Sequence, residues 1–186
     1  RYALSKEQIR MITTASALHD IGKISIPDEI LNKPGRLTAE EFAVIKGHSM
    51  AGANMLSELP LDQKEEPLVK TAYEICRWHH ERYDGGGYPD GLKGEEIPVS
   101  AQVVALADVY DALTSERCYK DAYSHEKAIE MILAGQCGAF NPLMLECLLD
   151  ISSSLKKKMG YKSKERYEQT DLSDIASRFH DFEMDS

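Results

Sequence analysis

Apolar residues recur at helical spacing along most of this chain, whereas the alternation of apolar and polar residues that is typical of strands is almost absent. Near the start, four apolar residues fall at three-residue steps: Ile9, Ile12, Ala15 and Leu18. They predict an amphipathic helix over residues 1–18, with the pair His19-Asp20 at its inner end. The whole pattern predicts an all-α bundle of about six to eight helices.

Capping signals indicate where the later helices begin. Thr38 followed by Glu41 is a capping box, and it predicts a helix that runs towards His48. Pro67 suits the first turn of a helix, and one face of that helix ends at a histidine. The residues on this face are Leu68, Ala72, Ile75 and His79.

The second half of the chain predicts one long loop and three helices. Residues 81–99 are rich in Gly, Pro and Asp, which indicates a long functional loop. Ser100 is expected to cap the next helix, on which two acids continue the apolar face: Val104, Asp108 and Asp111. Two further helices are expected from Ser124 to Gly135 and from Asn141-Pro142 to Leu155.

With 186 residues, 42% of them apolar, the chain is long enough for one domain with its own core. We assign residues 1–155 to that domain and residues 156–186 to a C-terminal extension. In the extension, Ile175, Phe179 and Phe182 either dock a short helix or belong to a partly disordered tail. Because the chain opens at Arg1 within a helical pattern, we expect an N-terminal truncation and an upstream regulatory domain.

Charge and composition exclude several classes of protein. The net charge of −9 would repel a polyanion, so neither DNA nor RNA is an expected partner. The four cysteines are scattered without CxxC spacing, which indicates reduced thiols. No apolar run approaches the roughly 20 residues of a membrane span, and no charged start precedes a short apolar segment as in a signal peptide. We therefore expect a cytoplasmic domain without a membrane segment.

Histidines and aspartates gather at expected helix ends and inward faces, where an unpaired polar side chain is costly to bury. Imidazole and carboxylate together suit transition metals, and adjacent ligands on a helix fit two ions better than one. We expect Asp20 to bridge two ions, and the alternative is a set of surface pairs and satisfied core histidines. The expected ligands are His19 and Asp108 for one ion and His48, His79 and His80 for the other.

Two further features point to a substrate beside these ligands. Lys23 follows Asp20 by three residues, so a helical turn would bring its ammonium over the ligands, where it could hold a phosphate or protonate a leaving alkoxide. Three glycines precede Tyr88-Pro89, and this aromatic ring could bind a flat base. The alternatives are a solvated lysine and a structural turn.

Three segments resemble the signatures of the HD-GYP family, a branch of the HD-domain metal phosphohydrolases. They are His19-Asp20-Ile-Gly-Lys23, the HHExxDGxGYP string from His79 to Pro89, and the segment from Ala107 to Thr114. The resemblance implies a helical HD domain with a glycine-rich GYP loop and two transition-metal ions. Iron is expected, with manganese, nickel or zinc as alternatives. It also implies hydrolysis of the bacterial messenger cyclic di-GMP to linear pGpG, GMP or both, and a homodimer is compatible with it.

Carried over by position, the resemblance makes Lys23 a catalytic residue beside Asp20. It also makes Arg117 and Lys120 phosphate contacts, with a solvated pair of charges as the alternative. Supporting roles around the ligands and the loop fall to three acids: Glu81, Asp84 and Asp111. The same six metal ligands as above match the family's motif positions.

The chain departs from the family by lacking a histidine in residues 1–18, where members carry a further ligand. Either that ligand lies upstream of Arg1, which we expect, or the first metal site is weakened. The expected reaction is attack on phosphorus by a hydroxide that bridges the metals. Another cyclic dinucleotide or nucleotide as substrate is one alternative, and a signalling module that binds without turnover is another.

Overall fold

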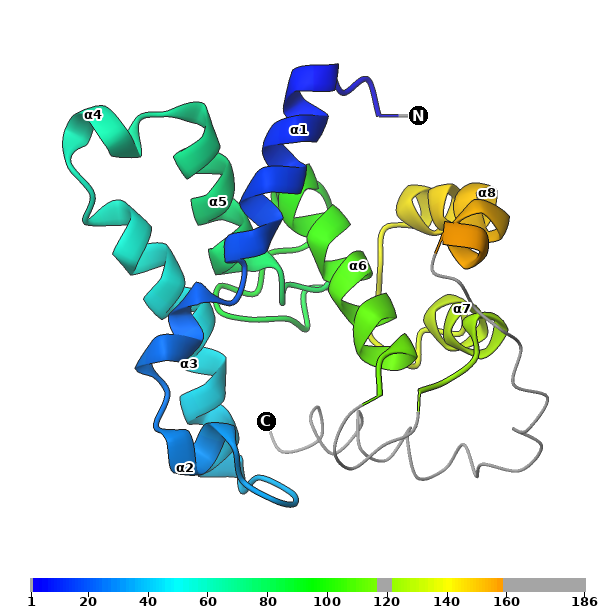
Figure 1. Ribbon diagram of the computed structural model, residues 1–186, viewed down its shortest axis with the longest axis horizontal. Helices are drawn as coiled ribbons and strands as arrows, with labels where there is room; N and C mark the ends of the chain where they lie inside the picture. Colours follow the sequence, from blue (N-terminus) through cyan, green and yellow to red (C-terminus); the bar gives the residue numbers. More distant parts are fainter. Residues whose placement is uncertain (1, 117–121, 159–186) are drawn as a thin grey trace. The chain divides into compact units, whose positions relative to one another are not determined.

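The structure is a computed structural model that describes residues 2–116 and 122–158, shown as a ribbon in Figure 1. Within these ranges the chain forms eight α-helices and three short 3₁₀-helices and no strand, so the predicted all-α fold is confirmed. The chain divides into two compact units, Arg1–Ala105 and Leu106–Ser186. The division at residue 155 stays a prediction, and the expected helix around Ile175 lies outside the described residues.

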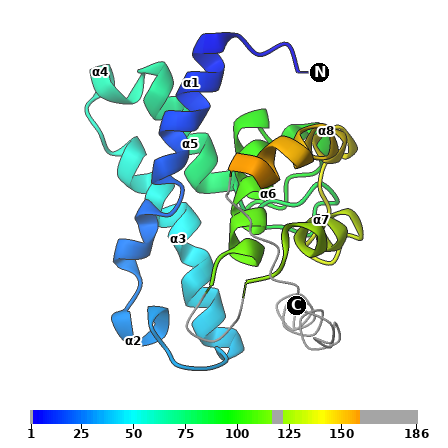
Figure 2. The ribbon, with the colours of Figure 1, turned by 45° about the vertical axis from the view of Figure 1, so that its right-hand side comes forward.

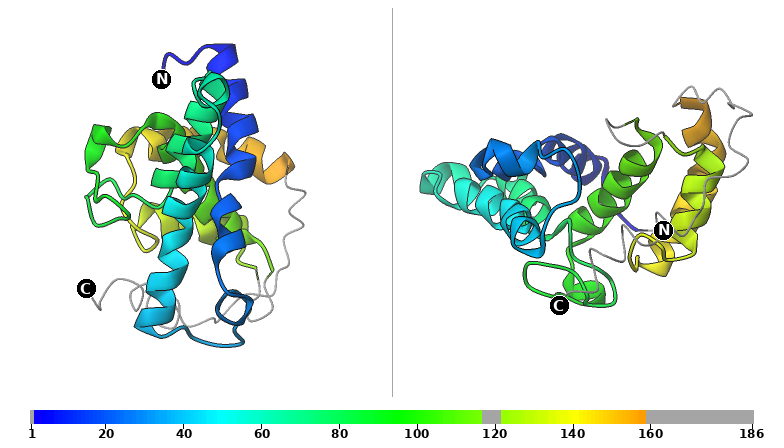
Figure 3. Two further views of the ribbon diagram at one scale, coloured as in Figure 1. Left: turned by 90° about the vertical axis from the view of Figure 1, so that its left-hand side faces the viewer. Right: turned by 90° about the horizontal axis from the view of Figure 1, so that it is seen from below.

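The helices of the first unit are, in chain order, α1 (Lys6–Ala15), η1 (Ser16–Leu18), η2 (Ile21–Ser25), α2 (Asp28–Leu31), α3 (Ala39–Ser57), α4 (Leu61–Lys64), α5 (Pro67–Trp78) and η3 (Gly94–Glu96). Helix α6 (Val99–Thr114) crosses the boundary between the units. The second unit continues with α7 (His125–Leu133) and α8 (Pro142–Lys158), which pack against each other (Figure 3).

Most of the predicted helix starts are confirmed. Thr38 forms its capping box with Glu41, Pro67 occupies the first turn of α5, and the Ser124 hydroxyl accepts from the Lys127 amide. Asn141 precedes α8, and its side-chain oxygen accepts a hydrogen bond from the Leu143 amide.

Two helix starts were predicted wrongly. Helix α1 begins at Lys6 rather than at residue 1, because Ser5 and Gln8 form a capping box there. The pair His19-Asp20 therefore follows a 3₁₀ turn and lies between η1 and η2. Ser100 lies within the first turn of α6 instead of capping it, and its hydroxyl donates to Glu74.

The core of the first unit lies where α1 and α3 pack against α5, and η2 lies along α3 (Figure 2). Four buried residues form one cluster there, with Ile12 and Leu56 packed against it: Ala15, Ala72, Ile75 and Val104. The predicted apolar stripes reach solvent at their outer ends, because Ile9 and Leu68 are exposed. This core fixes α3 and α5 side by side, and both helices carry residues of the site.

A close approach between η2 and α3 depends on Gly22. A Cβ atom on Gly22 would lie 1.9 Å from the carbonyl oxygen of His48 and 2.5 Å from the amide nitrogen of Gly52. Both neighbours are backbone atoms of α3, so neither can move aside cheaply. Only glycine lets the segment after Asp20 lie this close to the helix that carries His48.

Gly22→Ala is therefore expected to lower the free energy of unfolding by about 2 kcal/mol or more, because the two backbones must separate. The matched control is Gly47→Ala, since Gly47 lies in the middle of α3 and its added methyl would meet nothing within 4 Å. The control should raise stability by about 0.5–1 kcal/mol, because alanine is the better helix former. Chemical denaturation measures both, and equal effects of the two changes would contradict the packing described.

Candidate metal centre

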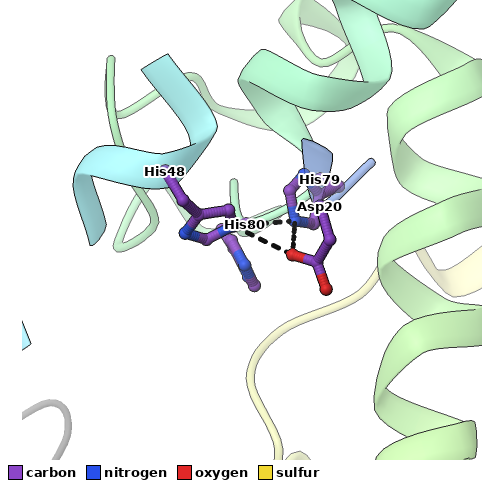
Figure 4. Close-up of side chains that lie close together, drawn as sticks. All are labelled: Asp20, His48, His79 and His80. Carbon is purple, nitrogen blue, oxygen red and sulfur yellow. Dashed lines mark hydrogen bonds and ion pairs between the residues drawn. The ribbon is translucent and has the colours of Figure 1, made fainter. Parts of the chain in front are cut away.

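Four side chains from three segments of the first unit converge, and we call this set the candidate metal centre: Asp20, His48, His79 and His80. Asp20 lies between η1 and η2, His48 lies on α3, and the two adjacent histidines follow the last turn of α5 (Figure 4). Each residue offers one ligand atom, and these atoms lie within 4.8 Å of one another. The sequence predicted all four as ligands.

The histidine rings are oriented by the backbone that precedes them. Nδ1 of His48 lies 2.7 Å from the Ile45 carbonyl oxygen, and Nδ1 of His79 lies 2.9 Å from that of Ile75. A carbonyl oxygen only accepts, so each Nδ1 carries the proton and donates it. Each Nε2 is then left with a lone pair. Metal-binding histidines are commonly oriented in this way, by a hydrogen bond from the ring nitrogen that does not bind the metal.

These lone pairs face one another and a carboxylate oxygen. Nε2 of His48 lies 3.4 Å from Nε2 of His79 and 3.3 Å from Oδ1 of Asp20. Two ligand atoms of a tetrahedral ion with bonds of about 2.1 Å lie about 3.4 Å apart. Oδ1 is buried and accepts no hydrogen bond within the described part of the chain, which is costly for a carboxylate unless a cation satisfies it. The four residues therefore fit a transition-metal ion.

The protonation states agree with this arrangement. Burial lowers the pKa of His48, and burial together with the charge of His48 lowers the pKa of His79 to about 4. Burial also holds the pKa of His80 well below its ordinary value. For Asp20, burial works in the opposite direction, but the contacts of its carboxylate with His19 and Lys23 outweigh it and lower the pKa. At neutral pH the set is three neutral imidazoles and one carboxylate, which is the state that binds metal.

The second oxygen of Asp20 faces a different pair of residues. Oδ2 lies 3.3 Å from Nε2 of His19 and 2.6 Å from Nζ of Lys23. His19 is oriented like the other histidines, with Nδ1 2.8 Å from the Ser16 carbonyl oxygen. The two carboxylate oxygens thus divide between two groups of partners, as an aspartate that bridges two ions would require. The predicted proximity of Lys23 to Asp20 is confirmed.

The loop after His80 is held by one buried carboxylate. Glu81 accepts hydrogen bonds from the amides of Asp90, Gly91 and Leu92 at 2.7, 3.1 and 3.1 Å. Burial raises the pKa of Glu81, and the three amide hydrogen bonds oppose that rise. The predicted supporting role of Glu81 therefore consists of closing the loop over residues 81–92.

Glu81→Ala is expected to open this loop, because three amides lose a charged acceptor and each such hydrogen bond contributes about 1.5–3 kcal/mol. Amide hydrogen exchange should accelerate at residues 90–92. Asp84→Ala serves as the control, since its exposed carboxylate bonds only within residues 82–86. Unchanged exchange at residues 90–92 in Glu81→Ala would show that other contacts close the loop.

A second anchor of the loop was not predicted from the sequence. The Asp90 carboxylate accepts from Arg77 at 2.7 and 2.9 Å and from the Trp78 indole at 2.7 Å. Asp90 lies 13 residues from Arg77 and 12 from Trp78 across an irregular loop, so no regular spacing in the sequence predicts the contact. This anchor fixes the loop to the end of α5 that carries the histidines.

The remaining predicted site residues lie as follows. Asp108 is on α6 in the second unit, and its role as a ligand stays a prediction. Asp111 is exposed and accepts from the Ser115 hydroxyl. Tyr88 is stacked on His80, with ring centroids 4.8 Å apart. Arg117 and Lys120 lie outside the described residues.

The region that carries this centre matches a known family. Residues 1–140 match the family described as HD domain. The chain belongs to the HD domain family. Three relatives of this HD domain confirm the resemblance to the HD-GYP branch. They are a "Probable cyclic di-GMP phosphodiesterase" of Vibrio cholerae (45% identical, over 80% of this chain and 34% of the relative), the "Cyclic di-GMP phosphodiesterase response regulator RpfG" of Xanthomonas campestris (43%, 84% and 40%) and the "3'3'-cGAMP-specific phosphodiesterase 2" of Vibrio cholerae (42%, 80% and 28%).

This HD domain spans about a third of the length of these curated relatives. Within the described residues, no helix is both long enough and apolar enough to cross a bilayer.

Proposed function

We propose that this HD domain hydrolyses a phosphodiester bond of cyclic di-GMP and releases linear pGpG, GMP or both. The observation that carries the proposal is the buried Oδ1 of Asp20, which faces histidine nitrogens that have no proton to share with it. Relatives that match four fifths of the chain are named cyclic di-GMP phosphodiesterases, which supports the choice of substrate.

The cofactor we propose is a pair of transition-metal ions, with iron as the first choice. His48, His79, His80 and Oδ1 of Asp20 would hold one ion, and His19, Oδ2 of Asp20 and Asp108 the other. When bound, such ions polarise phosphate oxygens and lower the pKa of a coordinated water towards neutrality. Mixed imidazole and carboxylate ligands suit iron, manganese, nickel and zinc better than magnesium.

Lys23 has two tasks in this proposal. In hydrolysis the water oxygen bonds to phosphorus, the bond from phosphorus to the ribose oxygen breaks, and the departing oxygen needs a proton. The ammonium of Lys23 has three N–H donors, of which one points to Asp20, so the others can bind a phosphate oxygen and protonate the leaving group. Asp20 keeps this ammonium beside the histidines.

Other parts of the proposal concern residues outside the candidate metal centre and the assembly of the protein. Arg117 and Lys120 are proposed to bind phosphate, and Tyr88 to contact a base of the ligand. We also propose that the domain acts in the cytoplasm under an upstream regulatory domain, and that a homodimer is its assembly.

A second candidate substrate is 3'3'-cGAMP, because a relative 42% identical to the chain is named as specific for it. The test is a panel of cyclic di-GMP, 3'3'-cGAMP and nucleoside monophosphates, given to protein purified without oxygen and supplied with iron or manganese. Fastest cleavage of cyclic di-GMP supports the proposal, and fastest cleavage of 3'3'-cGAMP selects the second candidate. Tight binding of a cyclic dinucleotide without any product would overturn both and indicate a signalling module.

A further inference from the structure

Lys46 lies beside the candidate metal centre without belonging to it. It precedes His48 by two residues on α3 and is partly buried. Its ammonium nitrogen lies 4.7 Å from the ring centroid of Phe42 and 5.3 Å from that of Tyr88. Cation–π contacts at these distances hold a lysine in place. The end of this long side chain is therefore fixed by two aromatic rings.

Tyr88 connects this ammonium to the metal centre. Its ring is stacked on the imidazole of His80, with a centroid separation of 4.8 Å and an interplanar angle of 26°. One ring thus contacts a candidate ligand and the Lys46 cation, so the cation and His80 are separated by no more than the two centroid distances together. A ligand the size of a dinucleotide can touch both.

The charge of Lys46 is not neutralised locally. In the described part of the chain, no carboxylate lies within 4.0 Å of its nitrogen, whereas Lys23, Lys33 and Lys70 each pair with an acid. Its ammonium is therefore held by two aromatic rings rather than by an acid. The contacts with the two rings form no salt bridge, so the N–H donors of the ammonium can still bind an anion.

We propose that Lys46 binds the phosphate of the cyclic dinucleotide that is not cleaved. This inference rests on the proposed function. A cyclic dinucleotide carries two phosphodiesters, each with one negative charge. The scissile phosphate lies at the metal centre beside Lys23, and the other phosphate needs a cation at a distance from it. Lys46 supplies that cation, and the rings of Phe42 and Tyr88 hold it in position before the ligand arrives.

The test compares two substrates in the full chain: cyclic di-GMP, with two phosphodiesters, and bis(p-nitrophenyl) phosphate, with one. Lys46→Met should raise KM for cyclic di-GMP about tenfold, as expected for a lost charge-assisted hydrogen bond. It should leave kcat/KM for the smaller substrate within about twofold of wild type. Lys46→Arg should retain most of the affinity, because it keeps the charge. Lys70→Met, which removes an exposed charge on α5, is the matched control and should change neither substrate.

Equal losses on both substrates would overturn the proposal, because they would show that Lys46 only supports the fold of the site. An unchanged KM for cyclic di-GMP would overturn it as well. If the wild-type chain binds cyclic di-GMP without cleaving it, the proposed hydrolysis fails, and calorimetric dissociation constants of wild type and Lys46→Met still decide the role of Lys46. If the wild type neither binds nor cleaves cyclic di-GMP, both proposals fail.

Discussion

Replacing Asp20 or His79 by alanine is expected to remove bound metal and to abolish turnover of cyclic di-GMP. Loss of a group that merely orients a ligand typically costs about 10–100-fold in metal affinity, and loss of the ligand itself should cost more. Asp20 has the larger expected effect, because its two oxygens face both groups of partners. Elemental analysis of protein purified without oxygen gives the metal content, and product formation gives the activity.

His125→Ala is the matched control for His79→Ala, because it also removes a buried histidine. The His125 ring bonds to the Tyr110 hydroxyl at 2.7 Å and to the Ser152 hydroxyl at 2.8 Å, and all three residues lie in the second unit. This change should lower stability but leave the metal content unchanged. Full metal content and full activity in Asp20→Ala or His79→Ala would refute the assignment of the centre.

Lys23→Met is expected to lower kcat for cyclic di-GMP by about 10²–10⁴-fold, the usual contribution of a positioned general acid. The loss should be at least about tenfold smaller with bis(p-nitrophenyl) phosphate, because nitrophenolate leaves without a proton and needs no general acid. The comparison of the two substrates therefore separates proton donation from phosphate binding.

Metal content should survive in Lys23→Met, since the lysine is not a ligand. Lys33→Met is its control, because Lys33 forms an ion pair with Glu41 away from the candidate metal centre. An equal loss of kcat on both substrates would contradict proton donation by Lys23 and leave it only a binding role.

Local patterns in the sequence were sufficient to predict the parts of the site that lie on regular helices. The capping box at Thr38 sets the start of α3, and the apolar face from Ala72 to Ile75 directs His79 inward. Both features act over one or two helical turns, so spacing alone reveals them. Only the adjacent histidines end the buried face of a helix, whereas Asp20 follows a 3₁₀ turn and His48 lies within α3.

The parts that sequence could not predict depend on contacts across irregular segments. The three amides that Glu81 binds lie 9 to 11 residues away along a loop. The division of the two Asp20 oxygens between different partners depends on how closely η2 approaches α3 at Gly22. Lys46 had one local signal, its spacing of four residues from Phe42, but its contact with Tyr88 is long-range.

Anomalous diffraction from crystals of the metal-loaded chain, recorded at the absorption edge of the bound metal, tests the central claim most directly. The account predicts a peak among the Nε2 atoms of His48 and His79, a nitrogen of His80 and Oδ1 of Asp20, with ligand distances of about 2.0–2.3 Å. A loaded protein whose peaks all lie elsewhere, with these four side chains still free of metal, would contradict it.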